Sequence, residues 1–384
     1  MNDESRHSKA NGANGIAAKL AVPLGALLVL PVAPVLAFGF DAKAPWIFLS
    51  GAIAIGVLAD WVRRSTEHLA ARVGPAVGGL LNVSFGSLAE LILAFFVLVA
   101  GNVDVVRAQI TGSIIGTSLF GLGLAVMIGT IGRPHLRFNR AKAGQMASLL
   151  ILVTIALLLP AVFDFTGHHL ADDAGVAISD ERLSIGVSVV LLLLYVANLI
   201  YTLVTHRDVF AAAPSPKENE QGSTWPLWLS IGILIVATAV IALEAHLVSG
   251  ALEDTAEALG VSQVFIGVVV LALVGTASDL FAASWFAAQG RMNLVLNICV
   301  GSAIQVALVV APLLVLGSWL LGHPMSLVFG NPLDLFAIAS AAFIVNSISS
   351  DGEATWFEGL LLVGVYVVLA MAFFFVPGGR AVIP

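Results

Sequence analysis

Two acidic residues, Glu90 and Asp279, lie inside long apolar stretches of this chain, whereas nearly all the others fall in polar segments or near the ends of apolar ones. An ionised carboxylate at bilayer depth costs at least ~2.5 kcal/mol on insertion scales. The alternative is a protonated structural acid that is hydrogen-bonded in a helix interface. Because two such residues are present, we favour a functional role for both.

The residues around the two carboxylates favour binding of a hard cation. Gly86 and Gly275 each precede a carboxylate by one helical turn, where glycine favours a local break that frees backbone carbonyls. Carbonyls, hydroxyls and carboxylates are oxygen ligands, and Ca²⁺ takes roughly six to eight of them. Softer metals fit poorly, because Cys299 is the one cysteine and the eight histidines lie in loops or near the ends of apolar runs. The pattern therefore indicates an oxygen-lined site that suits Ca²⁺.

The sequence around Glu90 recurs around Asp279. Both segments fit the pattern G-x7-G-x3-[ED]-x10-G-x10-G-S when the chain is shifted by 189 residues. The equivalent spans are offset by five predicted helices, an odd number, so the second copy is inverted, as in many secondary transporters with midplane sites. For Gly112-Ser113 and Gly301-Ser302, close packing and a place in the site both remain open. The superposed pairs are Gly78 and Gly267, Gly86 and Gly275, Glu90 and Asp279, Gly101 and Gly290, Gly112 and Gly301, and Ser113 and Ser302.

Composition predicts an all-α polytopic membrane protein. The 384 residues are 59% hydrophobic and 11% charged, which excludes an ordinary water-soluble domain. Acidic residues near the ends of apolar runs (Asp60, Glu244, Asp334 and Glu358) are interpreted as interfacial or capping groups. Apolar runs long enough to span a bilayer predict about eleven transmembrane helices, at 19–39, 45–62, 76–100, 105–130, 143–163, 182–204, 226–249, 261–289, 292–321, 333–350 and 355–376.

These spans divide the chain into one accessory helix and two inverted five-helix repeats. The expected parts are a disordered cytoplasmic N-terminus at 1–18, an accessory transmembrane helix at 19–44, a first exchanger repeat at 45–204, a cytoplasmic linker at 205–225 and a second repeat at 226–384.

The distribution of basic residues predicts the orientation. With the N-terminus in the cytoplasm, thirteen Lys and Arg residues lie on that side and four on the other, so the C-terminus is expected outside. No organellar targeting segment is evident, which is compatible with a bacterial inner membrane. The net charge of -7 and the lack of a dense basic cluster do not suggest a nucleic-acid partner.

Four motifs resemble the calcium/cation-proton exchanger (CAX) family of the cation/calcium exchanger superfamily. Residues 78–91, GGLLNVSFGSLAEL, are similar to the family signature GGLLNATFGNxxEL, and GTASD at 275–279 is similar to the GNAAE of the second signature, GNAAEH. The segments GSAIQ at 301–305 and DGEATWFEG at 351–359 resemble GSSxQ and DGxxxWxEG. The similarity runs over about residues 60–376.

This resemblance implies a calcium/proton antiporter. Glu90 and Asp279 would bind the cation and carry the proton coupling, and the neighbouring polar groups would be Asn82, Ser87, Thr276 and Gln305. Ser87 and Thr276 replace the usual Asn, Asp279 replaces Glu, and Leu280 replaces His, which leaves cation selectivity open.

We expect the protein to export cytosolic Ca²⁺ in exchange for protons by alternating access, with one Ca²⁺ or protons on the carboxylate pair. An empty, doubly ionised pair is costly to occlude, so the return step requires either metal or protons. Alternatives are antiport of another cation (Na⁺/H⁺, K⁺/H⁺, Mn²⁺/H⁺ or Na⁺/Ca²⁺) and, more remotely, an intramembrane enzyme, although no H-E-x-x-H motif is present. The expected partners are the transported ions and the lipid bilayer, with no cofactor, and a homo-oligomer remains open.

Overall fold

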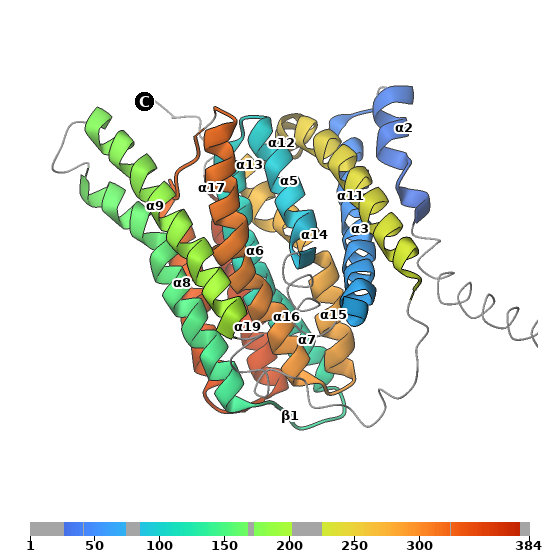
Figure 1. Cartoon of the computed structure of the whole chain (residues 1–384), viewed down its shortest axis with the longest axis vertical. Coiled ribbons are helices and arrows are strands. Elements are labelled where there is room, and N and C mark those ends of the chain that lie inside the picture. The colour runs from blue at the N-terminus through green and yellow to red at the C-terminus, as the bar shows by residue number, and fades with distance from the viewer. Residues whose placement is uncertain are drawn as a thin grey trace, which may run out of the picture.

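Long helices run between the two ends of the molecule and pack side by side as a bundle (Figure 1). The computed structural model describes residues 27–40, 42–73, 85–167, 173–201, 225–322 and 324–376. These residues are helical apart from loops and two strands of two residues each, so the predicted all-α fold is confirmed. The predicted N-terminal segment 1–18 and nearly all of the predicted linker 205–225 lie outside the described residues.

The first half of the chain supplies three long helices and several shorter ones. Its helices begin and end near polar or glycine-containing segments, as the apolar runs predict. Its elements are η1 (Leu27–Val29), α2 (Val32–Gly39), α3 (Ala44–Val73), α5 (Leu88–Val99), α6 (Val103–Ile115), the π-helix η2 (Gly116–Gly121), α7 (Leu122–Gly129), β1 (Leu136–Arg137), α8 (Arg140–Gly167) and α9 (Asp173–Ile200).

In the second half, several short helical segments lie between the long helix α11 and α15. Its elements are α11 (Leu227–Gly250), α12 (Leu252–Leu259), α13 (Gln263–Phe265), the π-helix η4 (Ile266–Leu271), α14 (Ala272–Gly275), α15 (Ala277–Ala288), α16 (Met292–Gln305), the π-helix η5 (Val306–Val310), α17 (Ala311–Leu320), α18 (Pro332–Ser349), β2 (Glu353–Ala354) and α19 (Trp356–Phe374).

Eight helical segments of the described residues are long and apolar enough to cross a membrane, and a bent pair, Leu252–Leu259 with Gln263–Gly275, would make a ninth. The predicted spans 19–39 and 76–100 overlap residues outside the described ranges, so the count of eleven remains a prediction. The eight are Ala44–Ala70, Val103–Gly129, Arg140–Thr166, Ser179–Ile200, Leu227–Gly250, Met292–Leu320, Pro332–Ser349 and Trp356–Phe374.

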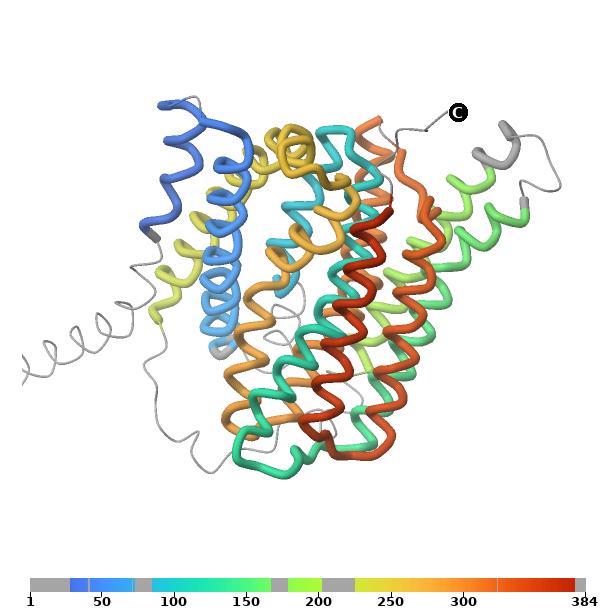
Figure 2. The backbone as a smooth tube through the Cα atoms, turned by 180° about the vertical axis from the view of Figure 1, so that it is seen from behind, coloured from blue at the N-terminus to red at the C-terminus, as the bar shows by residue number. Residues whose placement is uncertain are grey.

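Helices of the two halves pack against each other. The equivalent helices α3 and α11 lie side by side and antiparallel in both views (Figures 1 and 2). Non-equivalent elements also meet across the two halves, since η4 packs against α6 and α15 packs against α7. The core of the bundle is therefore the boundary between the repeats.

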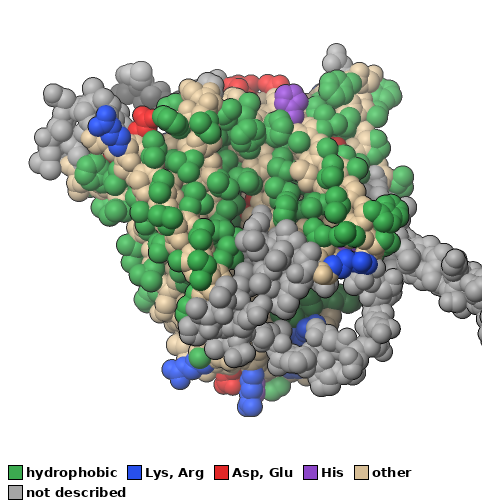
Figure 3. Space-filling view, viewed as in Figure 1, with side chains coloured by type: hydrophobic (Ala, Val, Ile, Leu, Met, Phe, Trp, Pro, Cys, Tyr) green, Lys and Arg blue, Asp and Glu red, His purple; other side chains and the backbone are tan. Residues whose placement is uncertain are grey.

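Most of the Lys and Arg side chains visible in Figure 3 lie toward the end of the molecule that carries β1. There β1 and β2 pair antiparallel, with Leu136 opposite Ala354 and Arg137 opposite Glu353. Because the pairing joins a loop of one half to a loop of the other, it ties the two repeats together at this end. By the positive-inside rule this end would be cytoplasmic.

The start of α19 carries a capping box, in agreement with the interpretation of Glu358 as a capping group. The Glu358 amide donates to Thr355 Oγ1 at 3.4 Å, and Glu358 Oε2 accepts from the Thr355 amide at 2.7 Å. These bonds satisfy helix N–H groups that have no partner within the helix.

Replacing Thr355 with Ala should lower the stability of the protein by about 1 kcal/mol, because an N-cap is lost. The midpoint of thermal unfolding in detergent measures this change. Thr166→Ala is the control, since the exposed Thr166 hydroxyl donates only to carbonyls of its own helix. Equal midpoints for the two variants would contradict the capping role.

Candidate ion-binding site

Both intramembrane carboxylates lie in the first turn of a helix. Glu90 lies in the first turn of α5 and Asp279 in the first turn of α15. The break before α15 is a single residue, Thr276, which separates α14 from α15 and whose Oγ1 donates to the Ala272 carbonyl at 2.8 Å. The N-terminus of a helix carries partial positive charge, which favours a carboxylate there. The chain thus presents one carboxylate from each repeat at a favourable helix end.

The two repeats meet at Glu90. A Cβ added to Gly275 would lie 2.9 Å from Glu90 Cγ, so the absence of a side chain at Gly275 makes room for Glu90. Asp279 lies close enough to repel the Glu90 carboxylate electrostatically. Ser87 Oγ donates to Gln305 Oε1 at 3.1 Å, which joins the start of α5 to the end of α16. Residues from both halves of the sequence therefore form one site.

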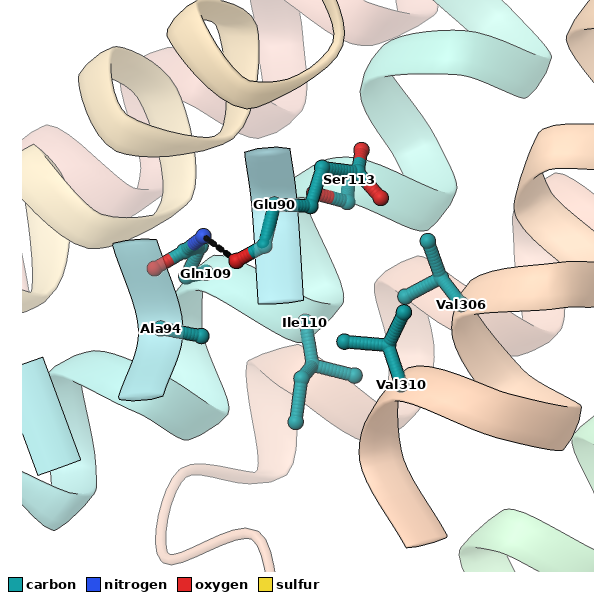
Figure 4. A pocket seen from close by; sticks show the side chains of 7 residues that line it. All are labelled: Glu90, Ala94, Gln109, Ile110, Ser113, Val306 and Val310. Carbon is teal, nitrogen blue, oxygen red and sulfur yellow. Dashed lines mark hydrogen bonds between the residues drawn. The ribbon is translucent and has the colours of Figure 1, made fainter. Parts of the chain in front are cut away.

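Glu90 is 3% exposed and lacks a well-formed hydrogen bond to either carboxylate oxygen from any described residue. Ser87 and Ser113 interact with the carboxylate, and Gln109 Nε2 donates to the Glu90 backbone carbonyl at 3.4 Å. Figure 4 shows Ser113 beside the Glu90 side chain and the Gln109 amide on its backbone carbonyl. Burying a carboxylate whose hydrogen bonds are incomplete is costly. A cation or a proton at this position would remove that cost.

A small pocket adjoins Glu90 between α5, α6 and η5 (Figure 4). Gln109 and Ser113 face it from successive turns of α6, as their spacing of four residues requires. Its remaining lining is apolar and consists of Ala94, Ile110, Val306 and Val310. Polar atoms therefore gather at the Glu90 end of an otherwise apolar pocket.

Asp279 is less buried than Glu90 and is influenced by charges at the end of α3. The Ser302 hydroxyl lies close enough to the Asp279 carboxylate to interact with it, and Arg63 and Glu67 act on it electrostatically. Arg63 also pairs with Asp60, at 2.7 Å. Asp279 therefore lies within electrostatic range of charged side chains of α3.

The sequence leaves the roles of the two Gly-Ser pairs open. In the structure the serines interact with the carboxylates, and Gly112 allows close packing. Ser113 and Ser302 each interact with the carboxylate of their own repeat. Gly112 serves packing, because its Cα faces the Val268 carbonyl at a distance that excludes any side chain. Gly301 is less crowded, with a Met146 side-chain atom 3.7 Å from the position of a Cβ.

A π-helix follows each Gly-Ser pair at an equivalent place in the two repeats. The segment η2 begins at Gly116 and η5 at Val306, within one residue of the 189-residue shift. π-Helical turns are rare and frequently occur at functional sites. We find no residue pattern in the sequence that predicts them, because the wider turn depends on the surrounding packing.

The structure brings together most of the predicted site residues. Glu90, Ser87, Gly86 and Gln305 lie at one junction, with the Gln305 Oε1 3.3 Å from where a Gly86 Cβ would be. Asn82 lies outside the described residues. No group of three or more His, Cys, Asp or Glu side chains in the described residues is arranged to hold a metal. The two carboxylates would therefore need hydroxyl, amide, backbone or water oxygens to complete a Ca²⁺ shell.

Replacing Gly275 with Ala should weaken cation binding by roughly 5- to 150-fold, because overpacking costs about 1–3 kcal/mol and the displaced group is Glu90. Calcium titration of the purified protein measures the effect. Gly317→Ala is the matched control, since a Cβ at Gly317 meets nothing within 4 Å. Unchanged calcium affinity in Gly275→Ala would show that Glu90 need not hold this position.

Comparison with known proteins identifies relatives over most of the chain. The sequence matches the family described as "Sodium/calcium exchanger protein" at residues 43–204 and 229–375. It is 38% identical over 371 residues to the Ca(2+)/H(+) antiporter of Aphanothece halophytica, covering 94% of this chain and 98% of that protein. The Ca(2+)/H(+) antiporter ChaA of Bacillus subtilis is 37% identical over 330 residues, or 85% of this chain and 92% of that protein.

A solved structure has the same fold. The crystal structure of the Ca2+/H+ antiporter protein YfkE superposes with a TM-score of 0.77 at 32% sequence identity. The match covers 91% of this chain and 98% of that chain.

Proposed function

Because the chain belongs to the sodium/calcium exchanger protein family, an integral membrane family, we propose that it is a Ca²⁺/H⁺ antiporter that exports cytosolic Ca²⁺ in exchange for protons. The observation that carries this proposal is the unsatisfied carboxylate of Glu90, close enough to Asp279 for the two to repel. Relatives named as Ca(2+)/H(+) antiporters, at 37–38% identity, support the choice of ions.

Competition for one site couples the two ions in this proposal. Two nearby carboxylates repel each other in a low-dielectric interior, and either one Ca²⁺ or protons can neutralise them. Ca²⁺ would use Glu90 and Asp279 with oxygens from Ser87, Ser113, Ser302 and Gln305. The site cannot be occluded while both carboxylates are charged and no ion is bound. The protein therefore changes its access from one side of the membrane to the other only with Ca²⁺ or protons bound.

The asymmetry of the site suggests how each face gains access. Asp279 interacts with the charged end of α3, which the positive-inside rule places in the cytoplasm. The buried Val306 and Val310 of η5 line the pocket beside Glu90. We propose that η5 and η2, at equivalent places in the two repeats, change their packing when access alternates.

The host membrane in this proposal is a bacterial inner membrane, with the N-terminus in the cytoplasm and the C-terminus outside. Basic residues such as the exposed Arg133, Arg137 and Arg140 support this orientation, since they share one end of the molecule. Labelling of single cysteines placed at Arg137 and at Asp254, in whole cells, would distinguish the two orientations.

Uptake by inverted membrane vesicles tests the function. With an imposed proton gradient, acidic inside, vesicles containing the protein should accumulate Ca²⁺ and release it when the gradient is dissipated. Parallel assays with Mn²⁺, Na⁺ and K⁺ establish selectivity, and vesicles without the protein set the background. Calcium uptake that depends on a sodium gradient but ignores the proton gradient would overturn the proposed coupling.

A further inference from the structure

A third carboxylate, that of Glu244, is buried within the membrane-spanning part of α11. Its position near the end of an apolar run suggests an interfacial or capping group, and the structure shows that this interpretation is wrong. Glu244 is 0% exposed, and neither carboxylate oxygen has a hydrogen-bond partner among the described residues. A charged carboxylate in such a place would be strongly destabilising. The proposed exchange mechanism does not use this group.

Three helices enclose the Glu244 side chain. Glu244 Oε2 lies 3.3 Å from where a Cβ of Gly51 would be, so the carboxylate occupies the space left by this glycine of α3. The same Cβ position is 3.6 Å from the Cβ of Ala33, a buried residue of α2. Since α2 belongs to neither repeat, the accessory helix closes the side of the α3 and α11 pair where Glu244 lies.

The equivalent position of the first repeat shows that the fold does not require an acid there. The shift that superposes Glu90 on Asp279 also superposes part of α3 on α11, and four buried positions of α3 coincide with buried positions of α11. The residue equivalent to Glu244 is Ile55, which is also 0% exposed. An aliphatic side chain therefore fills this place in one repeat, and a carboxyl group fills it in the other. The equivalent buried pairs are Phe48 and Ala237, Ala52 and Ile241, Ile55 and Glu244, and Ala59 and Val248.

Among the described residues, no charged group compensates Glu244. Helix α2 contains no ionisable residue, and His246 on α11 contacts Phe96 instead. None of the ionisable groups on the elements packed against α11 makes an ion pair, hydrogen bond or electrostatic interaction with Glu244 among the described residues. These groups are Lys43, Asp60, Arg63, Arg64, Glu67, His68 and Arg72 on or before α3, Glu90 on α5, and Glu253, Asp254 and Glu257 on α12.

We propose that Glu244 is a second proton-binding site, separate from the exchange site, which holds its proton while α2, α3 and α11 are packed as in this structure. Loss of the proton would leave a charge beside Gly51 that no neighbouring group of the described residues stabilises. The carboxylate must then reach water, which requires α3 and α11 to separate or slide. The proton on Glu244 therefore favours one packing of the equivalent helices of the two repeats.

Infrared spectroscopy of the purified full chain tests this proposal without requiring transport. At a pH that ionises exposed carboxylates, the wild-type protein should show a carbonyl stretching band of a protonated carboxylic acid that Glu244→Gln lacks. The band should disappear as the pH is raised further. Glu253→Gln, at an exposed position of α12, should retain the band. Identical wild-type and Glu244→Gln spectra at every pH would overturn the proposal and leave the exchange mechanism untouched.

The pH profile of transport supplies a second readout. Glu244→Gln and Glu244→Ile, the latter copying the residue of the first repeat, should both transport Ca²⁺. At saturating Ca²⁺, uptake by the wild type should fall over the alkaline range in which the infrared band disappears, and both variants should lose that fall. A folded variant with the wild-type pH profile would contradict a role for this proton in the movement of α3 and α11.

Discussion

Glu90→Gln and Asp279→Asn should each reduce proton-driven Ca²⁺ uptake by more than about 100-fold, because breaking a buried charge arrangement costs about 3–5 kcal/mol and each 1.4 kcal/mol is tenfold. Each substitution removes one negative charge and leaves a side chain of similar shape. The affected interaction is therefore the charge that binds Ca²⁺ or protons, rather than packing around α5 or α15.

Initial rates of uptake into inverted vesicles, normalised to the amount of folded protein, measure this loss. Glu253→Gln makes the same chemical change at an exposed position and should transport at the wild-type rate. If Asp279→Asn transported normally while Glu90→Gln did not, the cation would bind through one repeat alone.

Gly112→Ala should prevent normal folding. The Cβ of an alanine there would lie 1.9 Å from the Val268 carbonyl oxygen and 2.6 Å from the Ala272 Cβ. Overpacking of a core costs about 1–3 kcal/mol when side chains can move, and more is expected here because the obstacle is backbone of η4. A Cβ added to Gly267 would similarly lie 2.8 Å from the Val105 carbonyl oxygen. The backbones of α6 and η4 therefore approach each other closely at both glycines.

The yield of monodisperse protein and the midpoint of thermal unfolding measure this effect. Gly364→Ala is the matched control in α19, because its added Cβ meets nothing within 4 Å and alanine favours a helix by about 1 kcal/mol over glycine. Gly112→Ala should lower both the yield and the midpoint, and Gly364→Ala should lower neither. Equal yields and midpoints would contradict the close approach of α6 and η4.

Much of this arrangement is predictable from the sequence because the physical signals are local. Apolar length identifies the helices, and the cost of burying a charge singles out Glu90 and Asp279. The spacing shared by the two halves relates these residues to each other. A glycine one turn before each carboxylate predicts a break in the helix. In the second repeat the helix is interrupted at Thr276, directly after Gly275.

Other features depend on contacts between distant segments and leave no local signal. Gln109 is one of several polar residues of α6, and its contact with the Glu90 carbonyl becomes evident only when α5 is placed beside it. Glu244 resembles an end-of-helix acid, because the sequence does not show that Gly51 and Ala33 enclose it. The π-helices η2 and η5 arise from the packing of the bundle. Sequence spacing therefore predicts the carboxylates of the site more readily than the groups around them.

The central claim is that Ca²⁺ and protons compete for the pair formed by Glu90 and Asp279. Calorimetric Ca²⁺ titration of the purified protein in buffers of different ionisation enthalpy counts the protons released for each Ca²⁺ bound. Proton release by the wild type should fall as the pH is raised, and the double variant Glu90→Gln/Asp279→Asn should lose both Ca²⁺ binding and proton release. Tight Ca²⁺ binding without proton release at any pH, or unchanged binding in the double variant, would contradict it.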